Sequence, residues 1–345
     1  MEKNKVTIQD VAKRAGVSIT TVSRVMNKNY PVKESTKIKV EKAIEELNFT
    51  PNMLARGLIR NKTYTIGVIV PSIANLFFPT VVKGIEHYMK AHGYTIFLSD
   101  TEGDAKEERK IITTLMDRQV DGIIIIDPRN ENIKNGYLEE VTKKIPLVVI
   151  NGYSKGIKCH FVLNDQEMGT YDALNYLLEC GHKNVAFLRG KDSYSYDLKE
   201  KVYYDIHEKH EMVINQENVV IIEDGNSIQT SDLSMAAVMK RLESNNPPSA
   251  IFACNDTMAV GAMNGIKKAG LRVPEDVSII GYDNTMISQL TEPKLTTVDQ
   301  NMYELGQKSA RRLHEIMKDK NESFMRIVLE NSLIKRDTVT ILNQD

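Results

Sequence analysis

Residues 18–27, Ser-Ile-Thr-Thr-Val-Ser-Arg-Val-Met-Asn, carry hydrogen-bonding side chains where a buried helix would carry apolar ones. At helical spacing Val22 and Val25 share one side, which leaves the other side to Ile19, Thr20, Ser23, Arg24 and Asn27. An arginine guanidinium can donate two parallel hydrogen bonds to the O6 and N7 atoms of guanine. Arg24 and its polar neighbours therefore have the chemistry needed to contact the edges of DNA bases.

Two further helical patterns would support this segment. Thr7 can cap a helix over 8–15, whose apolar stripe consists of Ile8, Val11, Ala12 and Ala15. Gly16 can turn the chain, and Ser18 can cap the second helix. A third helix over about 34–47 would close a small core with Ile38, Ala43, Ile44 and Leu47. The arrangement predicts a helix-turn-helix, although an ordinary helical hairpin within a larger protein has a similar pattern.

The charge of the chain is unevenly distributed. The total is −1 at pH 7, but residues 1–62 contain 13 Lys and Arg against 6 Asp and Glu, a net charge of +7, and the remainder carries −8. A small basic segment on an acidic body is typical of a module that binds a polyanion such as DNA. A solvated charged surface would explain the charge equally well. The charge distribution therefore agrees with the predicted helix-turn-helix but is weak evidence for DNA binding on its own.

The chain has no pattern typical of an enzyme, a metal site or a cofactor site. The three cysteines, Cys159, Cys180 and Cys254, lack metal-ligand spacing, and no Ser-His-Asp set or Gly-rich phosphate loop is present. Cys254 could act as a nucleophile, but a small buried residue at a strand end is the favoured interpretation. Because no apolar run approaches about 18 residues and the first residues are polar, we expect a cytoplasmic protein.

Most of the chain after residue 64 alternates short apolar runs with amphipathic stretches. The runs cover residues 65–70, 95–100, 122–127, 146–151, 160–165, 184–190, 218–225, 249–256 and 277–283. Several runs are apolar at successive positions, which is typical of parallel strands covered on both faces. About nine such strands exceed one average sheet, so we predict an α/β body of two parallel-sheet lobes with a cleft between them.

Polar residues stand at the ends of these predicted strands, where ligands bind in parallel sheets. They are Asp100, Asp127, Asn151, Asp165, Asn255, Asp256 and Asp283. We expect about half of them to be helix caps or turn residues.

A short helix could form over residues 52–60, after Pro51, between the basic segment and the body. A helix of this length is only marginally stable unless it packs against a partner.

Over nearly its whole length the sequence resembles the lactose-repressor (LacI/GalR) family of bacterial transcription regulators. The resemblance rests on an ordered set of motifs: VTIQDVAKRAGVSITTVSRVMN (6–27), PNMLARGL (51–58), IGVIVPSIANLFF (66–78), VDGIII (120–125), CNDTMAVGAM (254–263), GLRVPEDVSIIGYDN (270–284) and LTTVDQNMYELG (295–306). It implies a homodimer that binds a pseudo-palindromic DNA operator, with a DNA-binding domain over 1–50.

The resemblance also implies which residues touch DNA. The family's base-reading positions fall on Ile19, Thr20 and Arg24, and the positions nearer the phosphates are Ser18, Thr21, Ser23 and Asn27. Residues 51–62 correspond to a hinge helix and linker, with Ala55 and Arg56 at the DNA and Leu58 wedged between base pairs in the minor groove. A Leu with a purely structural role in a linker is the alternative.

For the body over 63–340 the resemblance implies a two-lobed periplasmic-binding-protein-like fold, with the first lobe at about 63–162 and 291–322 and the second at about 163–290 and 323–340. A small effector, sugar-like in most relatives, would bind between the lobes and change the affinity for DNA. The effector positions fall on Phe77, Phe78, Asn151, Lys199, Asn255 and Asp283. Lys199 and Val202 replace an Arg and a Gly of many relatives, which weakens the expectation of the usual sugar-binding mode.

Two alternatives accompany this interpretation. Residues 300–311 resemble catabolite control proteins of low-GC Gram-positive bacteria, which implies that Met302, Tyr303 and Arg311 could contact the phosphorylated phosphocarrier protein HPr as a corepressor. The body alone would also suit a ligand-binding protein that does not bind DNA. The basic segment with its helix-turn-helix pattern argues against this second alternative.

Overall fold

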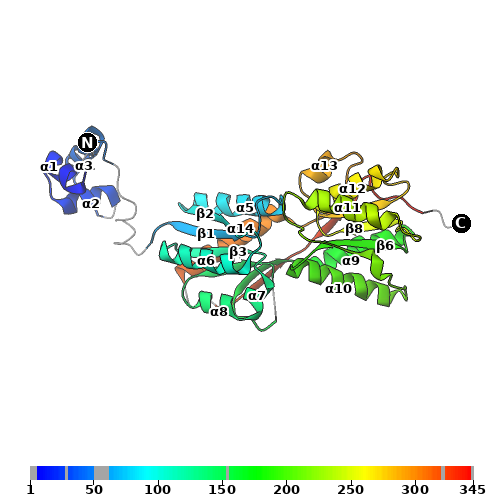
Figure 1. Cartoon of the computed structure of the whole chain (residues 1–345). Helices are drawn as coiled ribbons and strands as arrows, with labels where there is room; N and C mark the ends of the chain where they lie inside the picture. The colour runs from blue at the N-terminus through cyan, green and yellow to red at the C-terminus, as the bar shows by residue number, and fades with distance from the viewer. Residues whose placement is uncertain (1–5, 28–29, 50–61, 153–154, 320–322, 343–345) are drawn as a thin grey trace. The chain divides into compact units, whose positions relative to one another are not determined.

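The computed structural model describes residues 6–27, 30–49, 62–152, 155–319 and 323–342. The chain forms two compact units, Met1–Thr63 and Tyr64–Asp345. Figure 1 shows the helices of the first unit and the two sheets with their helices in the second. No helix among the described residues combines the length and the apolar character that crossing a membrane requires.

The first unit contains three helices, α1 (Ile8–Ala15), α2 (Ile19–Asn27) and α3 (Glu34–Glu46). Thr7 caps α1 in a capping box with Asp10, and Gly16 ends α1 with a φ of 68°, as the sequence predicts for both residues. The three helices enclose a small core whose fully buried side chains are Val11, Ala12, Val22, Val40, Ala43 and Phe49.

The prediction that Ile38 of α3 lies in this core is wrong. Ile38 is 57% exposed, and Val40 is buried in its place, whereas Ile44 and Leu47 pack against the core as predicted. Residues two positions apart lie about 200° apart around a helix, so Ile38 and Val40 face nearly opposite directions. Val40 lies on the same face as Ala43, Ile44 and Leu47, and this spacing decides which side chain is buried.

The second unit contains two six-stranded sheets. The first sheet has the order β11 (Arg326–Leu329), β5 (His160–Asn164), β4 (Leu147–Ile150), β3 (Gly122–Ile126), β1 (Thr65–Val70) and β2 (Thr95–Asp100). The second has the order β12 (Ser332–Ile334), β10 (Thr296–Asp299), β9 (Ser278–Asp283), β8 (Ala250–Ala253), β6 (Val185–Gly190) and β7 (Val219–Ile222). All neighbours are parallel except β12, which pairs antiparallel with β10.

Helices cover both faces of each sheet (Figure 1). In the first lobe α5 (Phe77–Ala91) and α14 (Met302–Lys318) cover one face, and α6 (Ala105–Asp117), α7 (Asn130–Lys134) and α8 (Tyr137–Thr142) cover the other. In the second lobe the helices are α9 (Gln166–Glu179), α10 (Tyr194–Lys209), α11 (Thr230–Leu242), α12 (Asp256–Lys268) and α13 (Ile287–Leu290), with a short 3-10 helix at Gln216–Asn218. This double coverage explains why the strands are apolar at successive positions.

The predicted limits of the two lobes need correction. The nine predicted runs all contain strands, but β10, β11 and β12 lie outside the predicted runs. The first crossing between the lobes, after Asn164, lies close to the predicted limit near 162. Strand β10 belongs to the second sheet and β11 to the first, so the other two crossings follow Asp299 and Leu329, not residues near 290 and 322. These three strands have only three or four residues, too few for their pattern to reveal which sheet they join.

Candidate DNA-reading helix and ligand cleft

The start of α2 is fixed by its own cap. Ser18 Oγ accepts a hydrogen bond from the Thr21 backbone N–H at 3.1 Å and lies 2.9 Å from Thr21 Oγ1. On the inner side Val22 is fully buried against the core. On the opposite side Ile19 is 45% exposed, and Thr20 and Arg24 are exposed. The helix therefore presents the three predicted base-reading residues to solvent on one face.

Two further contacts involve side chains of this unit. The guanidinium carbon of Arg24 lies 5.2 Å from the centre of the Tyr30 ring, a cation–π contact that restricts the Arg24 side chain. Arg14 forms a 2.6 Å ion pair with Glu46, which ties α1 to α3. Thr21 and Ser23 are half-buried, while the Asn27 side chain and the predicted hinge residues Ala55, Arg56 and Leu58 lie outside the described residues.

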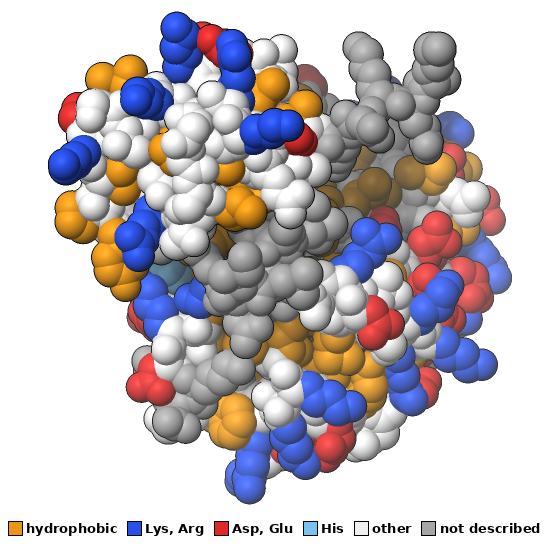
Figure 2. All heavy atoms as spheres, turned by 90° about the vertical axis from the view of Figure 1, so that its left-hand side faces the viewer, with side chains coloured by type: hydrophobic (Ala, Val, Ile, Leu, Met, Phe, Trp, Pro, Cys, Tyr) orange, Lys and Arg blue, Asp and Glu red, His pale blue; other side chains and the backbone are white. Residues whose placement is uncertain are grey.

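Basic side chains are exposed on the helices and turns of this unit. Figure 2 shows Lys and Arg side chains spread over the surface that faces the viewer. Those in the first unit that are exposed include Lys13, Arg14, Arg24, Lys33, Lys39 and Lys42. Such a surface attracts the phosphates of nucleic acid irrespective of base sequence. The unit thus presents exposed basic side chains together with one helix face on which Ile19, Thr20 and Arg24 are exposed.

A narrow cavity lies between the two lobes of the second unit. All six residues predicted to contact an effector line it: Phe77, Phe78, Asn151, Lys199, Asn255 and Asp283. Nine further lining residues were not among them: Asn75, Asp127, Gln166, Ser193, Ser195, Tyr196, Asn226, Cys254 and Gln300. The structure thus brings residues from eight or more separate segments of the chain to one place.

The aromatic part of the cavity comes from the beginning of α5. Phe77 and Phe78 are edge-to-face with ring centres 5.3 Å apart, and Asn75 Oδ1 accepts a hydrogen bond from the Phe77 backbone N–H at 2.9 Å. Both rings are nearly buried and also belong to the core of the first lobe. Their packing role and their position at the cavity are therefore compatible.

Lys199 on α10 is buried within this site. Its Nζ donates a hydrogen bond to the Cys254 carbonyl oxygen at 3.0 Å and lies 3.6 Å from the centre of the Tyr282 ring. Burial lowers the pKa of Lys199, an effect opposed by nearby acidic groups that include Asp283 and Asp127. Cys254 is also buried, and burial raises the pKa of its thiol to about 12, which is unfavourable for a nucleophile.

Two carboxylates lie near this ammonium group. Asp283 has a φ of 114°, is 4% exposed, and accepts a hydrogen bond from Gln300 Nε2 at 2.5 Å. Burial raises the pKa of Asp283 well above its ordinary value, and Lys199 opposes this effect. Burial likewise raises the pKa of Asp127 to about 6, against the lowering influence of Asn151 and Lys199. The site holds more carboxylates than cations.

Several buried polar atoms in this lining lack a hydrogen-bond partner in the protein. They are Gln166 Oε1, Gln300 Oε1 and Asn151 Nδ2, the last of which lies close enough to the Asp127 carboxyl to lower its pKa but makes no hydrogen bond of ordinary geometry. An unpaired buried polar group costs about 1–3 kcal/mol, so native proteins rarely leave one without a ligand or water. Three such atoms in one cavity are typical of a site whose hydrogen bonds are completed by a polar ligand.

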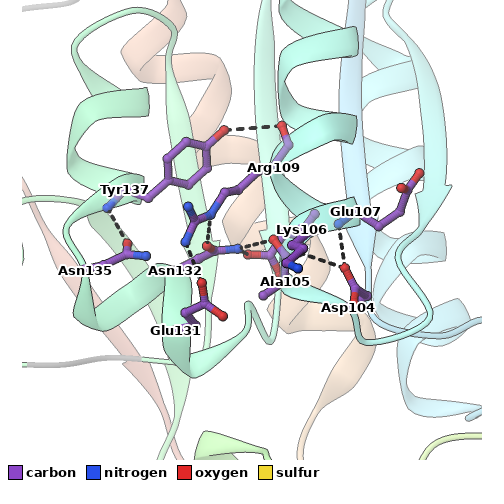
Figure 3. A network of polar contacts seen from close by, with 10 residues as sticks. Asp104, Ala105, Lys106, Glu107, Arg109, Glu131, Asn132, Asn135 and Tyr137 are labelled. Atoms are coloured by element: carbon purple, nitrogen blue, oxygen red, sulfur yellow. Dashed lines mark hydrogen bonds and ion pairs between the residues drawn. The ribbon is translucent and has the colours of Figure 1, made fainter.

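A second polar network fixes the loop that carries Asp127 (Figure 3). Asn132 Nδ2 donates to Glu108 Oε1 at 2.7 Å, and the Arg129 backbone N–H donates to Glu108 Oε2 at 3.0 Å. Arg109 Nε donates to Asn132 Oδ1 at 2.5 Å, and Arg109 also forms an ion pair with Glu131 at 2.8 Å. These bonds connect α6 to α7 and so hold the end of β3 in place.

The lobes touch directly at the edge of the cavity. Ser72 Oγ donates to the Asn226 carbonyl oxygen at 2.7 Å, and Asn75 Nδ2 donates to Asn226 Oδ1 at 2.8 Å. Because Asn75 and Asn226 both line the cavity, a ligand there would meet the same side chains that connect the lobes. Occupancy of the cavity and the angle between the lobes can therefore influence one another.

The other polar strand ends have mostly structural roles. Asp165 and Asn255 cap α9 and α12, and Asp100 accepts from the backbone N–H groups of Ile73 and Glu102. Asp256 is fully buried and binds Thr285 and Thr297. Asn255 both caps a helix and lines the cavity.

The predicted corepressor contacts on α14 differ in exposure. Met302 is 6% exposed and packs into the core of the first lobe, so its side chain is not placed to contact a partner. Met302 is the first residue of the amphipathic helix α14 and lies on its inner face. The prediction that the Met302 side chain contacts a corepressor is therefore wrong. Tyr303 is 39% exposed with its hydroxyl 2.5 Å from His87 Nδ1, and Arg311 is exposed.

Comparisons with known proteins agree with this architecture. Residues 7–52 match the family described as "Bacterial regulatory proteins, lacI family". Residues 174–339 match the family described as "Periplasmic binding protein-like domain". Catabolite control protein A of Priestia megaterium is 38% identical over 316 residues, covering 90% of this chain and 92% of that protein. The HTH-type transcriptional repressor PurR of Vibrio atlanticus (strain LGP32) is 36% identical, covering 98% of this chain and 99% of that protein.

Among solved structures, the lac repressor dimer bound to operator and the anti-inducer ONPF has a TM-score of 0.87 at 29% identity, covering 98% of this chain and 100% of that one. The match thus extends over the helix-turn-helix unit and both lobes. The chain belongs to the lacI family of bacterial regulatory proteins and is a DNA-binding transcriptional regulator with an effector-binding body.

Proposed function

We propose that this regulator is a repressor that binds a pseudo-palindromic operator in the cytoplasm as a homodimer. Ile19, Thr20 and Arg24 contact base edges, because they are the exposed residues at the start and middle of α2. Neighbouring phosphates are contacted by Ser18, Thr21, Ser23 and Asn27. On the family resemblance, Ala55 and Arg56 lie at the DNA and Leu58 enters the minor groove.

The edge of the first sheet supports the dimer. Strand β2 is an edge strand, and its Phe97 and Leu98 are 43% and 46% exposed. Exposed apolar side chains on an edge strand are a liability for a solitary protein but suit an interface. A second copy of the chain bound there would join two DNA-binding units, one for each operator half-site.

The cleft, in this proposal, binds a small sugar-like effector that controls DNA binding. The observation that carries this conclusion is the meeting of Phe77, Phe78, Asn151, Lys199, Asn255 and Asp283 in one cavity. Aromatic faces with amide and carboxylate groups suit the apolar faces and the hydroxyl groups of a sugar. Because the ligand would touch the residues that join the lobes, its binding energy can shift the lobe angle and with it the affinity for operator.

Selection of bound duplexes from a random DNA pool tests the repressor function. The full-length chain should enrich sites with approximate two-fold symmetry, and a promoter that carries such a site should be transcribed less when the protein is added. Failure to enrich any symmetric site at moderate salt would contradict the proposal. Enrichment without reduced transcription would leave a regulator that is not a repressor.

A second candidate is regulation by a protein corepressor, phosphorylated HPr. It is favoured by the 38% identity with catabolite control protein A and by the exposure of Tyr303 and Arg311 on α14. Operator affinity measured with the serine-phosphorylated and unphosphorylated carrier protein distinguishes the two candidates. An increase with the phosphorylated form alone, lost in Tyr303→Ala, would favour the corepressor.

A further inference from the structure

The charges that line the cleft are unbalanced. Its fifteen described lining residues include two carboxylates, Asp127 and Asp283, and one basic side chain, Lys199. Burial raises the pKa of both carboxyl groups, and ionisation of all three groups gives the cleft a net negative charge that no other described lining residue offsets. A group that is buried with an uncompensated charge is stabilised strongly by a ligand of opposite charge.

The single cation is already engaged by the protein. Lys199 donates to the Cys254 carbonyl oxygen and lies against the face of the Tyr282 ring. An anionic ligand that approached Lys199 would also meet Asp127 and Asp283. A phosphate or carboxylate group is therefore disfavoured in this cleft, because repulsion from two carboxylates opposes attraction to one partly satisfied ammonium.

Unpaired acceptors also exceed unpaired donors. Gln300 donates its Nε2 to Asp283, which directs its unpartnered Oε1 away from that carboxylate, and Gln166 Oε1 also lacks a partner. The unpaired donor is Asn151 Nδ2, because Asn151 Oδ1 accepts from the Asn164 backbone N–H at 3.3 Å. The complementary ligand must donate more hydrogen bonds than it accepts, as an ammonium group and hydroxyl groups do.

A second, wider groove adjoins the cleft at Asn226 and has an excess of acidic lining residues. Its acidic lining residues are Asp100, Glu102, Asp192, Glu223 and Asp224, against the basic residues Arg129 and Lys191. Lys191 is paired with Glu223 at 2.6 Å. A groove with an excess of one sign of charge raises the local concentration of small ions of the opposite sign. Cations are therefore concentrated beside the cleft.

From these charges and acceptors we infer that the effector is a polyhydroxy molecule that carries an amino group, whose ammonium binds between Asp127 and Asp283. Lys199 can neutralise the charge of only one of the two carboxylates. Asp127 supplies the second negative charge and is therefore the residue that determines specificity for a cationic group. This inference rests on the proposed sugar-like effector and specifies its charge.

Calorimetric titration of the full-length chain with matched sugars tests the inference. The probes are glucosamine, galactosamine and mannosamine, each compared with its neutral parent, its N-acetyl derivative and the 6-phosphate of the parent, at a pH where the amines are protonated. At least one amino sugar should bind about tenfold or more tighter than its neutral parent and its N-acetyl derivative, since a charged hydrogen bond in a buried site contributes that much. The 6-phosphates should not bind.

Variants separate charge recognition from general loss of the site. Asp127→Asn should abolish the preference for the amino sugar over its parent, whereas Asp117→Asn, at an exposed position in the same lobe, should keep it. Equal or tighter binding of a neutral parent or a phosphate overturns the inference but leaves the sugar-like effector standing. Binding by no member of the panel overturns the inference and also counts against the proposed effector class.

Discussion

The ammonium group of Lys199 lies 3.6 Å from the centre of the Tyr282 ring, over its face. Tyr282 directly precedes Asp283 on β9, and the Asp283 carboxyl group influences Lys199 electrostatically without forming an ion pair in direct contact with it. Lys199 itself is 1% exposed and comes from α10. A buried cation is thus held by an aromatic face, a backbone carbonyl and nearby carboxylates at the base of the cleft.

Removing this cation should destabilise the body in a pH-dependent way. We expect Lys199→Met to lower the free energy of unfolding by about 3 kcal/mol at pH 8, because it leaves the buried Asp283 carboxylate without its cation. The loss should be smaller at a lower pH, because burial raises the pKa of Asp283 and protonation of its carboxyl group removes the unpaired charge. Urea denaturation measures both values. Lys201→Met, at an exposed position of the same helix, is the control, and equal losses in the two variants would contradict this account.

The Glu108 network should make stability fall with rising pH. Burial raises the pKa of Glu108 from 4.5 to about 7, so the folded protein holds this proton more tightly than the unfolded chain does. The resulting stabilisation is complete below about pH 4.5 and is lost as the pH rises through about 7, a change of about 3 kcal/mol.

Substitution of Glu108 tests this pH dependence. Glu108→Gln cannot ionise, so the free energy of unfolding measured in urea should vary less between pH 4.5 and 7.5 than in the unmodified protein. Glu107→Gln, whose side chain is 43% exposed on the same helix, should retain the original dependence. An unchanged dependence in Glu108→Gln would show that other groups cause it.

Arg24 should carry base discrimination. Arg24→Ala is expected to reduce affinity for the selected operator by about 1–3 kcal/mol, with a much smaller effect on random DNA, because a bidentate contact to guanine is specific. Lys39→Ala removes an exposed charge from α3 and should weaken both kinds of binding similarly or not at all. Fluorescence anisotropy at fixed salt measures these affinities. Equal losses on operator and random DNA in Arg24→Ala would assign Arg24 to a phosphate.

The edge strand β2 should support the dimer. Phe97→Glu combined with Leu98→Glu should convert the dimer to monomer in sedimentation experiments, because four like charges would then meet across a symmetric interface. Val213→Glu is the control, since Val213 is 95% exposed and lies in the other lobe. A dimer that survives the double substitution would place the interface elsewhere.

The sequence predicted the strongly patterned elements and failed at the weakly patterned ones. Apolar runs such as 122–127 became buried strands because both faces of the sheet are covered, and Thr7 and Gly16 acted as the helix ends that their side chains favour. Strand β10, Thr-Thr-Val-Asp, has a single apolar residue, and its position depends on pairing with β9, which lies earlier in the chain. No local pattern contains that information, so the lobe limits were displaced.

Some residues that line the cleft could likewise be predicted from the sequence, and others could not. Asn151, Asn255 and Asp283 stand at ends of recognisable strands, where the geometry of parallel sheets gathers polar groups. Gln300 follows the unrecognised β10, and Asn226 lies in a loop, so only the folded chain brings them to the cavity. Of the four tyrosines between 194 and 204, Tyr196 alone lines the cavity, while Tyr203 is buried in the second-lobe core.

The central claim is that occupancy of the cleft and binding of operator are thermodynamically coupled. The most direct test is the dissociation constant of the tightest ligand from the sugar panel, measured on the full-length protein with and without saturating operator DNA. The account predicts that operator changes this constant by about 5- to 150-fold, because reciprocal coupling in such regulators corresponds to about 1–3 kcal/mol. Identical constants in the two measurements would contradict it.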